Sequence, residues 1–546
     1  MYLSSLGQHS TRQSRLKNLA SASFGMIFAW FFCAAFTSAF AATTPSSVPA
    51  VTRLTDVVIV GAGLSGLTAA HELQGTGLSY QVLELAPIIG GRVKTVEYSR
   101  PGKNKSMVTV SADAGMEEYW ESNPAVALIR KFKLPIQTDH AVSSIVIGGK
   151  LYSLGGKNPL DHMHRLFNGS ELASLTRFKA EIANMTQGLK SGGGIPTALQ
   201  HLVHVSFADW VKAHKLSAKL EDWIRITLEC EIGTGWDRIS AIDGLAEFHI
   251  FVGNRETKQG ETSYRVVGGN VKFVNALADS VGRENIATNK RVLRIARDPV
   301  KGTSRVTYLS TDTNQNSEIE AKHVIVTVPL YRMMEIQFEP ALSQPKRDAI
   351  AALGWGSYFK VHVMLPRSAE RFWTVRGRSM LPVLSDSDLG VIYDGNPDDI
   401  GEGMRKTGDT PRILSLLIGG DRAERFNFTP LDQARAEIKS AFEKLWPGVS
   451  RSIVDMEFYR YHPRAIAAWP VGRSRFDQMS DEIRTPENNV YLAGDHTESS
   501  HSDGAVNSAM RAVSQILKSK TTSIITPIIT PIIRGRTDDG PRNKKI

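Results

Sequence analysis

Three glycines and one acid lie close together in a strand–helix–strand pattern near the start of the chain. Gly61, Gly63 and Gly66 follow an apolar β-branched run and open a helix, and Glu84 lies near the end of the next predicted strand. The first glycine allows a tight turn, the second lets the backbone approach a pyrophosphate, and the third lets helix and strand pack closely. The acid can accept hydrogen bonds from a ribose hydroxyl. The glycines alone are a weak indication, but strand, helix and acid together predict a dinucleotide site.

A second stretch with a similar design lies near the other end of the chain, in NNVYLAGDHTESSHSDGAVNSAM. A short apolar strand, residues 490–493, runs into Gly494 and Asp495. After a polar loop, Gly504 and Ala505 open a helix. A helix N-terminus presents free N–H groups and stabilises an anion. We therefore expect this late strand to return to the first sheet and to meet the same ligand.

One lysine interrupts an otherwise apolar strand. In GSYFKVHV, Tyr358, Lys360 and His362 point to one face of the predicted strand, because side chains alternate along a strand. Two interpretations follow. Lys360 is either a buried residue that takes part in chemistry or an edge-strand lysine that faces solvent, and the strand alone favours the second.

Taken in this order, the motifs resemble the FAD-dependent amine oxidoreductases, a family that includes monoamine, polyamine and L-amino-acid oxidases. The resemblance extends from about Asp56 to Leu517 and is strongest in separate patches. These patches are VVIVGAGLSGL, LELAPIIGGRVKT, DAGMEEYW, VVGGNVKFVNALA, NKRVLRI, HVIVTVPL, GSYFKVHV and VYLAGDHTESSHSDGAVNSAM. The family resemblance implies FAD as the cofactor.

The resemblance assigns contacts with FAD residue by residue. Glu84 would hold the adenosine ribose, Val292 would meet adenine through its backbone, and Arg92 would lie by the phosphates and the ribityl chain. Gly115 and Met116 would pass close to the flavin. The complete set implied for the cofactor is Gly61, Gly63, Leu64, Ser65, Gly66, Glu84, Arg92, Gly115, Met116, Val292, Gly494, Asp495, Gly504 and Ala505.

In the C-terminal segment, the resemblance places Asp495 at the ribityl-pyrophosphate region and the Gly504-Ala505 helix start at the flavin pyrimidine edge. That edge carries negative charge in reduced flavin, which a helix N-terminus stabilises. Covalently flavinylated members attach FAD through a cysteine in this segment. No cysteine lies between His462 and Thr497, so we expect non-covalent FAD.

Three side chains are candidates for the reaction itself. Lys360 matches the family lysine that holds a water near flavin N5. Trp469 lies near the place of an aromatic wall beside the flavin, although a core tryptophan fits equally well. The aromatic residue that precedes the Gly-Ala helix in many amine oxidases is not evident here, and His501 or Ser502 would fill its place. No metal ligand set is expected.

The sequence says less about the substrate. L-amino-acid oxidases tend to have an arginine after the turn at Gly115-Met116, whereas this chain has Glu117, Glu118 and Glu121. These acids would favour a cationic amine. A solvated acidic loop explains them as well.

The expected activity is removal of a hydride from the carbon next to the nitrogen of an amine, which gives an imine and then an aldehyde or keto product. Dioxygen would reoxidise the flavin and yield hydrogen peroxide. Two alternatives stay open: a carbon–carbon desaturase or protoporphyrinogen-oxidase-like enzyme on the same scaffold, and a non-catalytic secreted FAD-binding protein. The expected partners are a small amine and dioxygen, without nucleic acid.

The elements that must position these residues indicate an α/β fold. We expect a Rossmann-type FAD-binding domain built from three separated segments, and a substrate domain of mixed sheet and helices. The FAD-binding segments are 55–120, 255–330 and 460–517, and the substrate domain comprises 121–254 and 331–459. A helical pattern over most of 121–251 and strands such as YFKVHVML support this division.

The two ends of the chain differ from the body in charge. Most of the formal net charge of +10 comes from residues 1–42 and 518–546. The body between them is near neutral, so its charge does not indicate nucleic-acid binding.

Three bases, an apolar run and SAFAA have the layout of a secretory signal peptide over 1–42, followed by a linker at 43–54. We expect a secreted or periplasmic protein, or one anchored in a membrane by its N-terminus. The tail 518–546 is expected to be disordered. Only one of the two cysteines, Cys230, lies in the body, and it is expected to be a small buried hydrophobe.

Overall fold

The first sheet of the computed structural model collects strands from three distant parts of the chain. The structure describes residues 54–101, 107–139, 144–153, 161–252, 262–366, 368–375, 378–395, 412–460 and 463–525. The predicted leader, nearly all of the linker and the last part of the tail lie outside these residues. Strand order is β10 (Ile286–Ala287), β2 (Tyr80–Leu83), β1 (Leu54–Val60), β13 (Gln315–Val326), β12 (Thr303–Ser310), β11 (Lys290–Asp298) and β14 (Gln337–Glu339), and β24 (Val490–Leu492) also pairs with β13. The late strand therefore returns to the first sheet, as expected.

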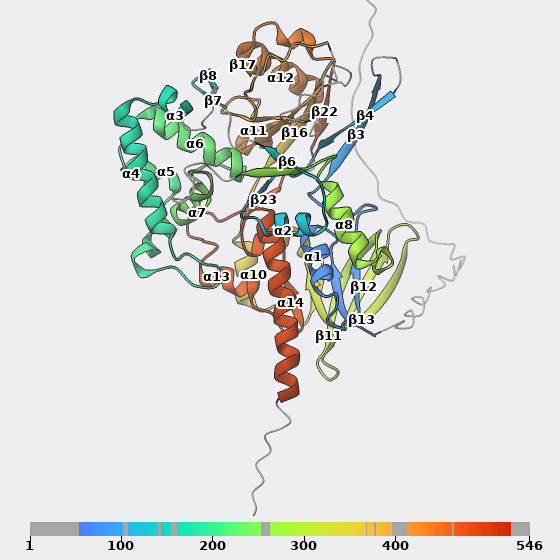
Figure 1. Cartoon of the computed structure of the whole chain (residues 1–546). Helices are drawn as coiled ribbons and strands as arrows, with labels where there is room; N and C mark the ends of the chain where they lie inside the picture. The colour runs from blue at the N-terminus through green and yellow to red at the C-terminus, as the bar shows by residue number, and fades with distance from the viewer. Residues whose placement is uncertain are drawn as a thin grey trace, which may run out of the picture. The chain divides into compact units, whose positions relative to one another are not determined.

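Helices cover both faces of this sheet, because its central strands are apolar on both sides. One face, with Val57 and Ile59 of β1, packs against four helices. These are α1 (Leu64–Glu72), α2 (Pro124–Lys131), α8 (Val271–Val281) and α14 (Ser502–Ile525). The other face, with Val58 and Val60, packs against α9 (Leu330–Met333), α10 (Gln344–Ala351) and α13 (Gln478–Arg484). In Figure 1 the long red helix α14 runs beside α1.

The second sheet is mainly antiparallel and carries Lys360. Its strand order is β22 (Asp455–Tyr459), β16 (Tyr358–Leu365), β21 (Arg412–Gly419), β20 (Val391–Asp394), β19 (Val383–Ser385), β7 (Ser144–Ile147) and β8 (Lys150–Ser153). One face packs against α11 (Gly420–Phe428) and α12 (Leu431–Leu445). The other face packs against α3 (Asp161–Leu166), α4 (Gly169–Thr186), α5 (Phe207–Ala213), α6 (Ala218–Ile232) and α7 (Ala241–Val252).

Short strands connect the two large sheets. They are β3 (Thr95–Pro101) with β4 (Met107–Asp113), β5 (Tyr119–Trp120) and β6 (Ile136–Asp139) with β9 (Ser263–Val266), and β15 (Gly354–Gly356) with β23 (Ile466–Ala468).

Turn and cap residues fix where the helices begin. Ser206, Ser217 and Asp477 each accept a backbone N–H at a helix N-terminus, and Asn168 forms a reciprocal capping box with Glu171. No helix among the described residues combines the length and apolar character needed to cross a bilayer.

The predicted α/β class is confirmed, and two of the expected boundaries differ from the structure. Strand β14 belongs to the first sheet although it follows residue 330, where we placed the start of the substrate domain. Helix α14 continues to Ile525, past residue 518, where we placed the start of the tail. The reason is visible in the sequence, since the first proline after α14 begins is Pro527.

Candidate active site

In the turn between β1 and α1, only the middle glycine has free space at the position that a Cβ would occupy. A Cβ on Gly66 would lie 1.9 Å from the carbonyl oxygen of Gly61, and Gly61 itself has a φ of +106°. A Cβ on Gly63 would meet nothing within 4 Å. Gly63 is also the N-cap of α1 and supplies no side-chain cap to the first turn, where Leu64 and Ser65 lie. A backbone that is accessible at Gly63 and uncapped at the helix start fits a pyrophosphate.

Glu84 lies beside this turn, at the end of β2. Its Oε2 accepts from the backbone N–H of Ala62 at 2.6 Å, and its Oε1 accepts from that of Ala86 at 2.8 Å. These bonds fix the carboxylate and leave further lone pairs for a ribose. The N–H of Lys290 donates to the carbonyl oxygen of Glu84 at 2.7 Å, which brings the strand of Val292 alongside.

Two glycine substitutions should separate folding from cofactor binding. Gly66→Ala should lower the free energy of unfolding by about 3 kcal/mol, because the added methyl overlaps a carbonyl oxygen. Gly63→Ala should change it by less than about 0.5 kcal/mol, because its methyl enters open space. Gly63→Ala should nevertheless weaken FAD binding, because the second glycine allows close approach of the pyrophosphate. Chemical denaturation of the flavin-free proteins and titration with FAD measure the two effects. A Gly63→Ala protein that binds FAD like the parent would contradict this assignment.

Arg92 and Asp495 join the first and the last of the three segments that we predicted to bind FAD. The guanidinium donates to both carboxylate oxygens, with 2.7 Å between Nη1 and Oδ2, and it also donates to the carbonyl oxygen of Ala465 at 2.7 Å. Burial alone would raise the pKa of Asp495, but Arg92 lowers it well below its ordinary value. Gly494 precedes this pair with a φ of +128°, and its N–H donates to Ser508 of α14 at 2.8 Å. The start of α14, with Gly504 and Ala505, is thereby held close to the pair.

Lys360 is fully buried and belongs to a charge network. Strand β16 lies between β22 and β21, so the interpretation as a solvent-facing edge lysine is excluded. Its Nζ donates to the carbonyl oxygen of Gly115 at 2.8 Å and pairs with Glu117. The Glu117 carboxylate also lies 3.5 Å from Arg265 and accepts from the Ser415 hydroxyl at 2.6 Å. The predicted turn at Gly115 and Met116 is therefore tied directly to the second sheet.

Burial and mutual charge shift the pKa values around Lys360. Burial lowers the pKa of Lys360 itself. Burial would raise the pKa of Glu117, but Lys360 and Arg265 hold it below its ordinary value. Burial and the neighbouring Glu117 raise the pKa of Asp113 to about 7, and burial with the Lys360 charge lowers that of His362 to about 4.

The acids of the Glu117 stretch have three different environments. Glu117 is buried and paired, so it is neither part of a solvated loop nor free for a substrate. Glu118 accepts from the Ser263 hydroxyl at 2.8 Å. Glu121 pairs with Arg130 at the surface, 2.8 Å apart.

His501 pairs with an acid that the sequence did not single out. Its Nε2 lies 3.0 Å from Oε2 of Glu247 on α7. Burial alone would lower the pKa of His501, but Glu247 raises it to about 9. Arg475 pairs with both Glu247 and Asp243, and all three side chains are buried. Nothing in the sequence signalled these partners, because each is an isolated charge in an apolar or loop stretch.

Trp469 packs against the ion-pair network of Arg475 and does not line a cavity among the described residues. Its side chain is 1% exposed and belongs to the core on the α10 and α13 face of the first sheet. Its Nε1 donates to the Ser480 hydroxyl at 3.2 Å, and the Arg475 guanidinium lies 4.7 Å from its ring centre. Of the two interpretations of Trp469, the structure supports the core tryptophan, which packs against Arg475.

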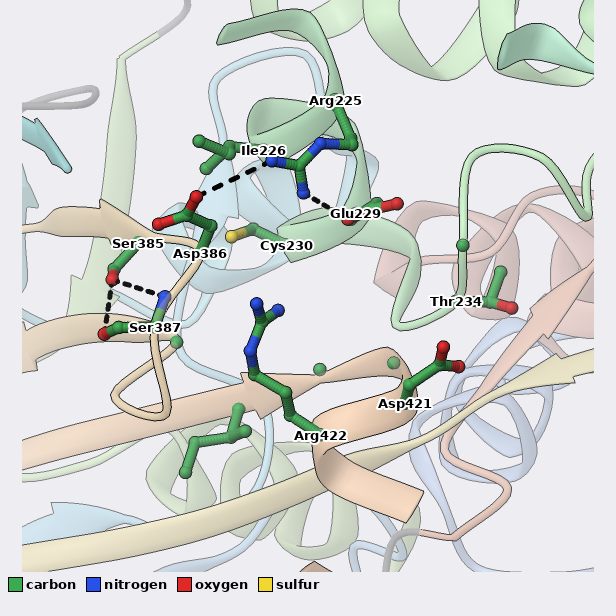
Figure 2. Close-up of a pocket in the computed structure, with 15 residues that line it drawn as sticks. Arg225, Ile226, Glu229, Cys230, Thr234, Ser385, Asp386, Ser387, Asp421 and Arg422 are labelled. Atoms are coloured by element: carbon green, nitrogen blue, oxygen red, sulfur yellow. Dashed lines mark hydrogen bonds and ion pairs between the residues drawn. The ribbon is translucent and has the colours of Figure 1, made fainter. Parts of the chain in front are cut away.

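A separate cavity of about 80 Å³ lies at the end of α6, bordered by Cys230, Ser385 and Arg422 (Figure 2). Arg225 crosses it to pair with Glu229 at 3.3 Å and Asp386 at 3.6 Å. Burial raises the pKa of the Cys230 thiol to about 12, and the side chain packs against the apolar core as a partly buried residue rather than the fully buried one that we expected. Neither Lys360 nor His501 lines this cavity.

The fold and the site define a dinucleotide-binding oxidoreductase scaffold with a second sheet that carries a buried lysine. The family described as flavin containing amine oxidoreductase matches residues 64–517, and the chain belongs to this family. It is therefore an FAD-dependent amine oxidoreductase.

Individual relatives and solved structures agree with this family. The putative flavin-containing monoamine oxidase AofH of Mycobacterium tuberculosis is 24% identical over 84% of this chain and 96% of its own length. Polyamine oxidase 1 of Zea mays is 22% identical over 83% of this chain and 87% of its own. Cyclohexylamine oxidase from Brevibacterium oxydans has a TM-score of 0.68 at 21% identity, covering 86% of this chain and 99% of that one. Putrescine oxidase bound to putrescine gives 0.69 at 19% identity, covering 85% and 99%.

Proposed function

We propose that the chain oxidises a small amine at the carbon next to nitrogen, gives an imine that hydrolyses, and passes the electrons to dioxygen with release of hydrogen peroxide. The observation that carries the proposal is Lys360, buried in a central strand and bonded to the carbonyl oxygen of Gly115. A surface lysine only faces solvent, whereas a lysine that is buried and bonded in this way is typical of a functional site. FAD, when bound, supplies the hydride acceptor.

The chain's own residues divide the remaining work. Gly63, Glu84 and the Arg92–Asp495 pair hold and orient the cofactor. The Lys360–Glu117 pair fixes the turn at Gly115 and excludes water, since both side chains are almost fully buried. Non-covalent attachment is consistent with the described residues, whose one cysteine, Cys230, has a pKa of about 12 and lines the separate cavity. We also propose export through the N-terminal leader, which fits an enzyme that acts outside the cytoplasm.

Anaerobic mixing with a panel of amines tests the activity. An amine that is a substrate should bleach the yellow flavin absorbance, and admission of air should restore it with one peroxide per turnover. Flavin that is reduced only by apolar polyenes or tetrapyrroles would instead indicate a carbon–carbon desaturase. Flavin that no compound reduces would indicate a non-catalytic FAD-binding protein. A leader fused to a reporter protein tests export separately.

A further inference from the structure

The backbone turn at residues 113–117, which contains two of the predicted flavin contacts, is held by buried side chains from two parts of the fold. Asn270 lies just before α8, which packs on the first sheet, and its side chain is fully buried. Its Nδ2 donates to the carbonyl oxygen of Met116 at 3.1 Å and to that of Glu117 at 2.8 Å. The N–H of Met116 donates in turn to the carbonyl oxygen of Arg92 at 3.0 Å. The turn is thereby fixed from the side of the first sheet.

The second sheet holds the same turn through two side chains of β16. Lys360 donates to the carbonyl oxygen of Gly115 at 2.8 Å, and Nε2 of His362 lies 3.0 Å from the carbonyl oxygen of Asp113. Both side chains are fully buried and point to the same face of the strand, because side chains alternate along a strand. Two residues that are two positions apart on β16 therefore bind two carbonyls that are two positions apart in the turn. We call Lys360, His362 and Asn270 the clamp.

Tyr98 and Tyr459 determine which ring nitrogen of His362 carries the proton. A carbonyl oxygen can only accept, so the hydrogen bond to Asp113 assigns the proton to Nε2. Nδ1 must then accept, and the Tyr98 hydroxyl of β3 donates to it at 2.6 Å. The Tyr98 hydroxyl accepts in turn from the Tyr459 hydroxyl of β22. Burial and the Lys360 charge lower the pKa of His362 to about 4, so the ring stays neutral and keeps this arrangement at neutral pH.

We propose that His362 is a positioning residue for the reaction, which sets where Gly115 and the Lys360 ammonium lie relative to the flavin. This proposal rests on the proposed amine oxidation and on the predicted place of Gly115 beside the cofactor. Without the His362 N–H, the buried carbonyl of Asp113 loses its donor, and the backbone that leads to Gly115 is free to move away from β16. A displacement of about 1 Å at a reacting group can cost about 100-fold in rate, so a smaller displacement should cost about 10-fold.

Paired substitutions at His362 test the proposal in the FAD-loaded enzyme. His362→Phe keeps a ring but removes its donor and acceptor, whereas His362→Gln keeps an N–H that can reach the Asp113 carbonyl. At saturating amine, the rate of anaerobic flavin reduction should fall about 10-fold in His362→Phe and less than about 3-fold in His362→Gln. The amine concentration at half-maximal rate should stay parental in both, because neither substitution removes a substrate contact. A parental rate in His362→Phe, or equal losses in the two variants, would overturn the proposal.

The visible circular dichroism of bound FAD gives a readout that does not depend on turnover. It reports how the protein surrounds the flavin, so the spectrum should shift in His362→Phe and return toward the parental one in His362→Gln. His71→Phe is the matched control, because His71 is also a buried histidine, with Nδ1 3.0 Å from the Ser280 hydroxyl. It should lower stability and leave both the flavin spectrum and the reduction rate parental. A spectrum that is unchanged in His362→Phe, or changed as much by His71→Phe, would also overturn the proposal.

Tyr98→Phe covers the case in which His362→Phe does not fold. It removes one hydroxyl, leaves Nδ1 of His362 without this donor and should slow flavin reduction by about 3-fold. A parental rate in this variant would overturn the proposal. If no amine reduces the parent flavin while the His362 variants still shift its spectrum in this order, the proposed oxidation fails and the role of His362 in positioning the turn stands.

Discussion

Lys360→Met should slow flavin reduction or reoxidation by about 100-fold while the purified protein stays yellow, which is the size of loss that a small displacement of the reacting groups can cause. FAD binding should persist because none of the predicted phosphate or ribose contacts involves Lys360. Stopped-flow spectroscopy of the two half-reactions shows which one slows. A variant that turns over like the parent would remove Lys360 from the mechanism.

The same substitution also leaves a buried acid without its main partner. Glu117 would keep the Ser415 hydroxyl and Arg265, but it would lose the ammonium group that lowers its pKa. Lys360→Met should therefore destabilise the protein by about 3 kcal/mol. The double variant Lys360→Met/Glu117→Gln should recover much of that stability without recovering activity.

Recovery of stability without activity would show that the rate loss is not a consequence of misfolding. Lys322→Met provides a matched control, because Lys322 is also a strand lysine paired with an acid, in this case Asp56 at 2.8 Å. Its side chain is 50% exposed, so its ion pair contributes little and neither stability nor rate should change measurably. If this control slows the reaction as much as Lys360→Met does, the loss is general rather than local.

The local parts of the site could be predicted from the sequence because their partners are near in the chain. Gly61, Gly63 and Gly66 act within one turn, and Glu84 follows on the next strand, so spacing alone reveals the arrangement. The strand YFKVHVML is found as β16, residues 358–365, because alternation and apolar content suffice to define it. The return of β24 to the first sheet followed from its apolar strand and the Gly-Asp that ends it.

The pairings between distant residues could not be predicted in the same way. Lys360 and Glu117, or His501 and Glu247, lie more than two hundred positions apart, and no periodicity links them. The acid at 117 was weighed as a substrate contact or a surface charge, whereas it is paired with the buried Lys360. Composition shows that charges are present, but only the fold shows which of them neutralise one another.

Some elements carry too little local signal to be recognised. Strand β14 has three residues, so no alternation distinguishes it from a loop, and its place beside β11 comes from tertiary pairing. Trp469 had two interpretations because a tryptophan next to a Pro-Val-Gly turn suits both a core and a ligand site. Its packing against Arg475 and Ser480 decides for the core.

Arg475→Met should lower the free energy of unfolding at neutral pH by about 3–5 kcal/mol, because it leaves two buried carboxylates without their shared cation. Arg475 pairs with Asp243, with 2.8 Å between Nε and Oδ1, and with Glu247, and all three side chains are less than 7% exposed. The double substitution Asp243→Asn/Glu247→Gln in the Arg475→Met background removes the orphaned charges and should restore part of the loss. Urea denaturation of the flavin-free proteins measures both steps.

The pH dependence of this loss has a definite sign. In the parent, Arg475 and His501 lower the pKa of Glu247, so this acid contributes stability above its unfolded pKa and loses that contribution only in strong acid. Without Arg475, burial acts with less opposition and raises the pKa values of both carboxyls, so the folded variant holds protons that the unfolded chain releases. The variant should then lose stability relative to the parent as pH rises from about 4 to 7. A deficit that is constant over this range would mean that lost packing on Trp469, rather than orphaned charge, is the cause, and the triple variant would in that case show no recovery.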